Sequence, residues 1–328
     1  MLLQVPAGAC VLALGGCASL EASGFGASGA RVDASQISAS PTVLVATTRR
    51  PVDGAKAKPW FGAERASAMR VARAKLTPPG EGRFSLAAVG LDDWRLDAIE
   101  ESPDLGGPFG EGISGGEVLV YVHGFNQTFE TAVLDAARLS DGIKFHGETV
   151  AFTWPSKASL LDYGYDRDSA MWSRDALVSV LDGLMTNPRV TRIHVVAHSI
   201  GTMLALEALR QLYDRHGEAV AVPLGAVVFA APDIDMDVFT SSVAHVGPIA
   251  SKITVLTATN DRALAISRWM AGGMTRVGAA QKAQLEKLGL HVIDGSREGW
   301  GVINHDLFLS NAKIRQVIRH EVDSPRGA

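Results

Sequence analysis

The chain has little cysteine, little net charge and no internal repeat. Both of its cysteines, Cys10 and Cys17, lie within the first seventeen residues, so the remaining residues have no thiol for a disulfide bond, a cysteine metal site or a cysteine nucleophile. A formal net charge of −4 in 328 residues gives no electrostatic argument for binding nucleic acid. The histidines do not show the H-E-x-x-H spacing of zinc hydrolases. We therefore expect no metal, no cofactor and no nucleic-acid partner.

The first forty residues are typical of an exported protein. Residues 5–16 are apolar and small but too few to span a bilayer. They lack the Lys or Arg that usually precedes such a stretch in a signal peptide. Leu14-Gly15-Gly16-Cys17 resembles the lipobox of bacterial lipoproteins, in which the cysteine is acylated. Residues 18–40 are rich in Ser, Ala and Gly and predict a flexible tether. We expect 1–17 to be a signal peptide and Cys17 to anchor the protein to a membrane of the cell envelope, on the periplasmic or outer-membrane side. Secretion is the alternative.

Residues 41–322 are expected to form a single α/β domain, followed by a short tail at 323–328. A hydrophobic content of 47% and a charged content of 20% are those of a globular protein that buries a large core. Apolar runs typical of strands alternate with segments of helical spacing, which predicts a mostly parallel, doubly wound sheet with helices on both faces. Strands are expected at 42–48, 69–76, 83–89, 118–122, 149–154, 192–198, 226–230, 253–257 and 291–293. Helices are expected at 129–139, 168–185, 201–214, 238–246, 263–270 and 307–322.

One sharp turn carries the strongest catalytic signal. In Val195-Val196-Ala197-His198-Ser199-Ile200-Gly201 a serine stands at the apex between an expected strand and an expected helix, as in a nucleophile elbow. The small side chains of Ala197 and Gly201, two residues to either side, let strand and helix pass closely. We predict a strained backbone at Ser199 and a nucleophilic role for its hydroxyl.

Further polar residues follow other expected strands. His123-Gly124-Phe125 follows one strand, Asp233 follows a second and Asp261 follows a third, while His305 comes in the loop after the last. Parallel sheets place their sites at the carboxyl ends of the strands, so these residues and Ser199 are expected at one edge.

These motifs resemble those of a known superfamily. The order Ser199, Asp261, His305 is similar to the catalytic triad of the α/β hydrolases, and His123-Gly124-Phe125 resembles their oxyanion-hole turn. With Ala-Pro-Asp-Ile-Asp and Asn-His-Asp, the chain is similar to a bacterial group of uncharacterised α/β hydrolases known as a domain of unknown function. The resemblance covers about residues 41–320 and implies an α/β-hydrolase fold with a nucleophile elbow, and hydrolase chemistry.

The resemblance also implies a role for each residue. His305 would be the general base, Asp261 would orient it, and the backbone N–H groups of Phe125 and Ile200 would form the oxyanion hole. The residues expected to support the site are His123, Gly124, His198 and Gly201.

Asp233 is the alternative triad acid. Together with Asp235 and Asp237 it also fits a helix cap and first turn, which is a purely structural role.

The most specific function that follows is a serine hydrolase acting on small carboxylic esters. A thioesterase, amidase, lipase or acyltransferase on the same triad is the alternative within the fold, and a non-catalytic scaffold tethered to the envelope is the alternative outside it. The connection at 234–252 is too short for a large lid, so we expect short acyl chains to be preferred.

Overall fold

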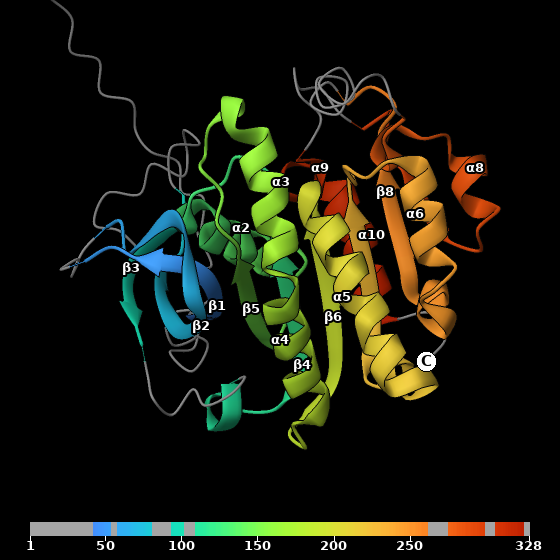
Figure 1. The fold of residues 1–328 in the computed structure, drawn as a ribbon. Helices are drawn as coiled ribbons and strands as arrows, with labels where there is room; N and C mark the ends of the chain where they lie inside the picture. The colour runs from blue at the N-terminus through green and yellow to red at the C-terminus, as the bar shows by residue number, and fades with distance from the viewer. Residues whose placement is uncertain are drawn as a thin grey trace, which may run out of the picture. The chain divides into compact units, whose positions relative to one another are not determined.

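One mixed sheet organises the part of the chain that the computed structural model describes, which is residues 42–53, 58–80, 93–101, 109–261, 275–298 and 306–324. Within these residues nine strands lie in the order β3-β2-β1-β5-β4-β6-β7-β8-β9 (Figure 1). The expected signal peptide and tether, Cys17, the strand at 83–89, the helix at 263–270 and His305 lie outside them.

Most strand pairs are parallel, as predicted. β1 pairs with β5, and every pair from β5 to β9 is parallel, whereas β1–β2 and β2–β3 are antiparallel. β2 and β3 lie within residues 51–116, where the sequence pattern is hard to interpret. β2 is longer than the expected strand at 69–76, and no strand was predicted at the position of β3. The strands are β1 (Thr42–Pro51), β2 (Phe61–Thr77), β3 (Arg95–Glu100), β4 (Gly116–Val122), β5 (Glu148–Thr153), β6 (Val190–His198), β7 (Leu224–Ala230), β8 (Ile253–Thr257) and β9 (His291–Asp294).

Helices cover both faces of the sheet. Figure 1 shows α3, α4 and α5 in front of it and α2 and α10 behind it. None of the described helices is long and apolar enough to cross a membrane. The α-helices are α2 (Phe129–Gly142), α3 (Tyr163–Trp172), α4 (Arg174–Thr186), α5 (Ile200–His216), α6 (Met236–Val243), α8 (Lys282–Glu286), α9 (Leu307–Ser310) and α10 (Ala312–Asp323). Short 3₁₀ helices lie at Gly110–Gly112, Leu160–Asp162, Gly217–Ala221, Gly247–Lys252 and Val277–Ala279.

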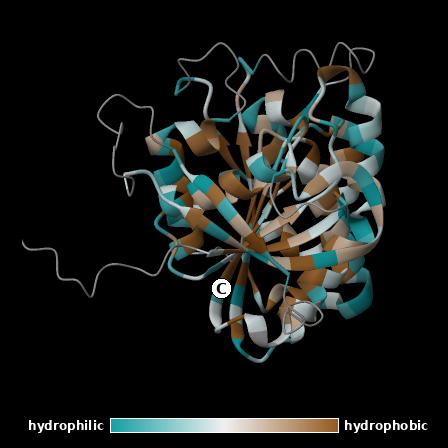
Figure 2. Ribbon diagram, turned by 90° about the vertical axis from the view of Figure 1, so that its left-hand side faces the viewer, coloured by the Kyte–Doolittle hydropathy of each residue, from teal (hydrophilic) through white to brown (hydrophobic). Residues whose placement is uncertain are grey.

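The alternation of side chains along each strand divides the core into two layers. In β4, Val118, Val120 and Val122 pack with residues of α4 and α5, whereas Leu119 and Tyr121 pack with residues of α2 and α10. Successive side chains of a strand point to opposite faces, so a strand covered on both sides is apolar throughout. Hydrophobic residues accordingly run along the strands in Figure 2.

Two expected helices are each broken in two. The helix expected at 168–185 is α3 and α4, separated at Ser173, whose Oγ donates to the carbonyl of Ser169 at 2.8 Å. A side-chain bond of this kind often bends a helix, and Trp172, next to the break, is exposed instead of on the buried side. The helix expected at 307–322 is α9 and α10, because the Asn311 side chain caps α10 by accepting from the N–H groups of Lys313 and Ile314.

The strand order fixes where a site forms. The chain passes from β4 to its neighbour β5 on one side and then crosses to β6 on the other side of β4. The connections after β4 and β6 therefore diverge at the carboxyl ends of these strands, which is the usual position of a ligand site in an open α/β sheet. His123 follows β4 and Ser199 follows β6, so both lie at this switch point.

Candidate active site

Ser199 lies at the apex of a strained turn between β6 and α5. Its backbone has φ 52° and ψ −124°, a conformation that residues with a side chain rarely adopt. The turn is held from both sides, because the Ser199 N–H donates to the carbonyl of Ala230 at 3.0 Å and its own carbonyl accepts from the N–H of Thr202 at 3.1 Å. The predicted strain at this serine is confirmed.

Glycines let the turn at Ser199 approach the loop that follows β4. A Cβ atom on Gly201 would lie 2.3 Å from the carbonyl oxygen of His123, and one on Gly124 would lie 2.9 Å from the Cβ of Ser199. No side chain fits at these separations. The structure therefore brings the expected oxyanion loop against the expected nucleophile.

His123 is a buried, neutral histidine that shapes this loop. Its ring stacks on Trp154 with a centroid distance of 4.5 Å. Nδ1 lies 2.8 Å from the carbonyl oxygen of Gly124, and Nε2 accepts from the N–H of Trp154 at 3.0 Å. Burial, with the charge of Arg49 adding to it, lowers the pKa of His123 to about 3. At neutral pH Nδ1 therefore carries the proton and donates to Gly124, which fits the expected supporting role.

Asp233 belongs to a buried ion pair and not to a helix cap. Its Oδ1 lies 3.0 Å from Nε of Arg276, and both side chains are almost inaccessible. The hydroxyl of Tyr163 donates to the other carboxylate oxygen at 2.9 Å. The cap of α6 is Asp235, whose side chain accepts from the N–H groups of Asp237 and Val238. The cap interpretation is therefore wrong for Asp233 and confirmed for Asp235.

The structure places four of the other expected site residues but not His305. Asp261 is buried just after β8, where its N–H donates to the carbonyl of Ala258 at 3.0 Å. His198 is buried before the elbow with its ring 4.7 Å from that of Phe308. Ile200 opens α5, and the ring of Phe125 meets Tyr163 edge-on at 5.4 Å. His305 lies outside the described residues, so the structure does not place the expected base.

Three buried residues beside the site escaped the sequence analysis. Arg49 ends a run of buried residues in β1, and Ser156 and Asp166 follow β5. The one signal in the sequence was a charged residue at the end of an apolar, β-branched strand. Among the described residues no group of three His, Cys, Asp or Glu side chains is arranged to hold a metal ion.

Comparison with known proteins gives one family. A family model described as "Alpha/beta hydrolase of unknown function (DUF900)" matches residues 111–321, more than half of the chain. The match begins after β1, β2 and β3. It agrees with the expected fold class and with the resemblance drawn from the motifs.

Individual relatives are distant. An uncharacterized protein of Nostoc sp. is 28% identical over 123 residues, which cover 30% of this chain and 32% of that protein. The chain thus matches about a third of the length of this relative. Among solved structures, an uncharacterized protein from Bacillus cereus has 12% identity and a TM-score of 0.41 over 64% of this chain and 60% of its own. Est1E from Butyrivibrio proteoclasticus has 12% identity and a TM-score of 0.40, and the match covers 78% of this chain and 96% of Est1E.

The contact between the elbow and the loop predicts the effect of a single methyl group. In Gly201→Ala the new Cβ would meet two carbonyl oxygens, at 2.3 Å from His123 and 2.8 Å from Val122. Backbone must shift to relieve this, so we expect the free energy of unfolding to fall by about 1–3 kcal/mol, with a loss of activity. The control is Gly164→Ala in α3, where a Cβ meets nothing within 4 Å. Urea unfolding of both variants measures the effect, and equal stabilities would contradict the contact.

The buried His123 predicts how stability depends on pH. Its folded pKa of about 3 lies below the ordinary histidine value of 6.5, so the unfolded chain binds one more proton between these values. Stability due to this group is complete above about pH 6.5 and falls by about 1.4 kcal/mol per unit as pH decreases toward 3. His123→Gln should reduce the slope of the unfolding free energy against pH by about 1.4 kcal/mol per pH unit, which corresponds to one proton. The control is His146→Gln, at an exposed histidine. Equal slopes for the parent and His123→Gln would refute the lowered pKa of His123.

Proposed function

Because this chain belongs to the family of alpha/beta hydrolases of unknown function, we propose that it is a serine hydrolase that cleaves carboxylic esters, with Ser199 as nucleophile. The observation that carries the proposal is the strained Ser199, which follows β6 and lies against the glycine loop that follows β4. Strain of this kind is stored where the surrounding structure enforces it, and a strand-to-helix turn of this kind places a serine at the carboxyl edge of the sheet. Ser199 itself is 2% exposed.

The proposed reaction has two acyl-transfer steps. Ser199 Oγ attacks the ester carbonyl while its proton passes to the base, for which His305 is our candidate. The backbone N–H of Ile200, at the start of α5, and that of Phe125 would stabilise the negative charge on the tetrahedral oxygen. The base returns the proton to the departing alcohol, and water then releases the acid from the acyl-enzyme by the same route.

We propose Asp261 as the acid that orients this base. It is buried in the turn that follows β8. The carboxylate of Asp233, its rival, is already engaged by Arg276 and by the Tyr163 hydroxyl. A carboxylate held by a buried guanidinium serves the fold, which counts against Asp233 as the triad acid.

We also propose that the acyl group is short. The connection between β7 and β8 contains only α6 and a 3₁₀ helix at Gly247–Lys252, so it has no large cap to enclose a long chain. A mainly apolar cavity of about 340 Å³ lies between α3, α5 and α6. Its lining includes Met203, one helical turn after Ser199, but not Ser199 itself. Its volume is near the lower end for ligand pockets.

The nucleophile and the substrate class are tested together. The parent should hydrolyse nitrophenyl esters with acyl chains of about two to eight carbons fastest. Each further CH₂ group increases the rate only if it is buried against an apolar surface. Ser199→Ala should lose nearly all turnover and all labelling by a fluorophosphonate probe while remaining folded. Ser241→Ala, an exposed serine of α6, is the control. Residual turnover of Ser199→Ala within about tenfold of the parent would exclude this nucleophile, and an unlabelled parent would favour a scaffold.

The two acids are separated by their different losses. Asp261→Asn should keep its stability and lose turnover by about 10³–10⁴, because the base would lose control of its tautomer. Asp233→Asn leaves the buried guanidinium of Arg276 without its carboxylate, which should cost about 3–5 kcal/mol of unfolding free energy. Asp235→Ala, a cap variant, should cost about 1 kcal/mol. An inactive but stable Asp233→Asn beside an active Asp261→Asn would move the acid to Asp233.

A further inference from the structure

A single arginine joins three segments beside the site. Arg49 lies near the carboxyl end of β1 and is 1% exposed. Its Nη1 donates to the carbonyl oxygens of Gly62 at 3.2 Å and Ser156 at 3.0 Å, and its Nη2 donates to that of Gln127 at 2.8 Å. These acceptors belong to β2, to the loop after β5 and to the loop after β4. The planar fork of a guanidinium can reach such divergent acceptors together.

The charge of Arg49 is retained in spite of its burial. Burial lowers the pKa of the guanidinium to about 9, with the charges of Asp166 and Tyr165 opposing the change. The side chain is therefore protonated at neutral pH. A buried charge is costly unless polar groups compensate it, and here the compensation comes from backbone carbonyls whose positions the arginine in turn fixes.

The loop after β4 is held at several further points. The N–H of Asn126 donates to Asp166 Oδ2 at 3.3 Å, and the N–H of Gln127 donates to Ser156 Oγ at 3.1 Å. Ser156 in turn donates to the same Asp166 oxygen. Asn126 has a φ of 62°, so the loop turns sharply just after Phe125 and depends on these bonds to keep its shape.

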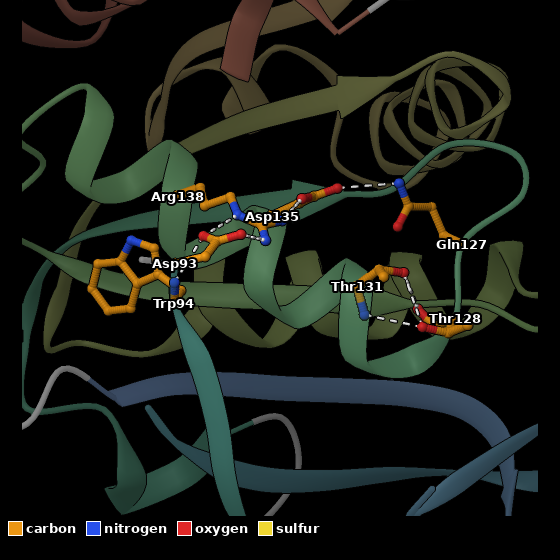
Figure 3. A network of polar contacts seen from close by, with 7 residues as sticks. All are labelled: Asp93, Trp94, Gln127, Thr128, Thr131, Asp135 and Arg138. Carbon is orange, nitrogen blue, oxygen red and sulfur yellow. Dashed lines mark hydrogen bonds and ion pairs between the residues drawn. The ribbon is translucent and has the colours of Figure 1, made fainter. Parts of the chain in front are cut away.

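The side chain of Gln127 extends the attachment to a second set of residues. Its Nε2 donates to Asp135 on α2 at 3.1 Å, Asp135 accepts from Arg138 at 2.6 Å, and Arg138 also donates to Asp93 (Figure 3). Asp93 lies just before β3, separated from it only by Trp94. Both Arg49 and Asp93 thus lie before residue 111, where the match to the family begins.

We propose that Arg49 is a positioning residue of the oxyanion hole, holding the loop from Gly124 to Gln127 so that the N–H of Phe125 meets the substrate oxygen at Ser199. The inference rests on the proposed hydrolase function. It gives the antiparallel strands β1 and β2 a part in catalysis, since β1 carries the arginine and β2 supplies one of its three acceptors.

If Arg49 has this role, its replacement should weaken binding of the transition state more than binding of the substrate. Oxyanion donors act on charge that develops only as the tetrahedral oxygen forms, so a misplaced donor lowers kcat and leaves KM nearly unchanged. Removal of one such donor costs about 10²–10³ in kcat. A donor that is displaced and not removed should cost less, on the order of tenfold or more.

Two variants and one control test the proposal. Arg49→Met removes the charge. Arg49→Lys keeps the charge but replaces the planar fork by a single nitrogen, which cannot take the place of both Nη1 and Nη2. The control is Arg73→Met, because Arg73 of β2 also donates to a backbone carbonyl, that of Gly112 at 3.0 Å, away from the loop. The assay measures kcat and KM on nitrophenyl acetate and the affinity for a trifluoromethyl ketone, which forms a tetrahedral adduct with a serine nucleophile.

We expect both Arg49 variants to lose kcat with KM within about twofold, and the affinity for the ketone to fall by the same factor as kcat. Arg49→Lys should retain more activity than Arg49→Met, and Arg73→Met should match the parent. If Arg49→Met fails to fold, Arg49→Lys decides. An unchanged kcat in Arg49→Lys, or an equal loss in Arg73→Met, would overturn the inference. A parent that neither turns over the ester nor binds the ketone would instead refute the proposed function.

Discussion

The close approach of the elbow at Ser199 to the loop after β4 is the contact on which the rest of the site depends. It requires a glycine on each side, since a Cβ on Gly201 would lie 2.3 Å from the His123 carbonyl and one on Gly124 would lie 2.7 Å from His198 Nδ1. Because β4 and β6 pair in parallel, with Val122 opposite Ala197, the loop after β4 and the turn at Ser199 begin side by side. The strained turn at Ser199 is packed against this loop, and His123 within the loop is kept neutral by the burial of its ring.

Buried charges surround this contact in pairs or with polar compensation. Arg49 binds three carbonyls on one side of the site, while the ion pair of Arg276 with Asp233 lies on the other side. The N–H of Asp233 also lies 3.3 Å from the carbonyl of Ser199. Side chains of this kind are expensive to bury and specify the conformation of the backbone they bind. The backbone at the carboxyl ends of these strands is thus held by buried polar contacts.

Local patterns in the sequence predicted the parts of the fold that are locally determined. The elbow follows from an apolar strand, a serine between small residues and a helix-forming segment, all within about twenty residues. Arg49 could not be found in this way, because its acceptors at Gln127 and Ser156 are 78 and 107 residues away and are reached only after β1 joins the sheet. The break at Ser173 was missed for a related reason. Its hydroxyl also bonds to Thr48 Oγ1 at 2.8 Å, a tertiary contact that helical periodicity does not reveal.

The structure of the protein after reaction with a fluorophosphonate would show which residue is the nucleophile and which groups bind the oxyanion. We expect a phosphorus–oxygen bond at Ser199 and a phosphonyl oxygen about 2.7–3.1 Å from the backbone nitrogens of both Phe125 and Ile200. We also expect the carbonyl of Gln127 to remain bound to Arg49 in the adduct. An adduct on another residue, or a phosphonyl oxygen directed away from the loop after β4, would contradict the assignment of Ser199 and of the oxyanion hole.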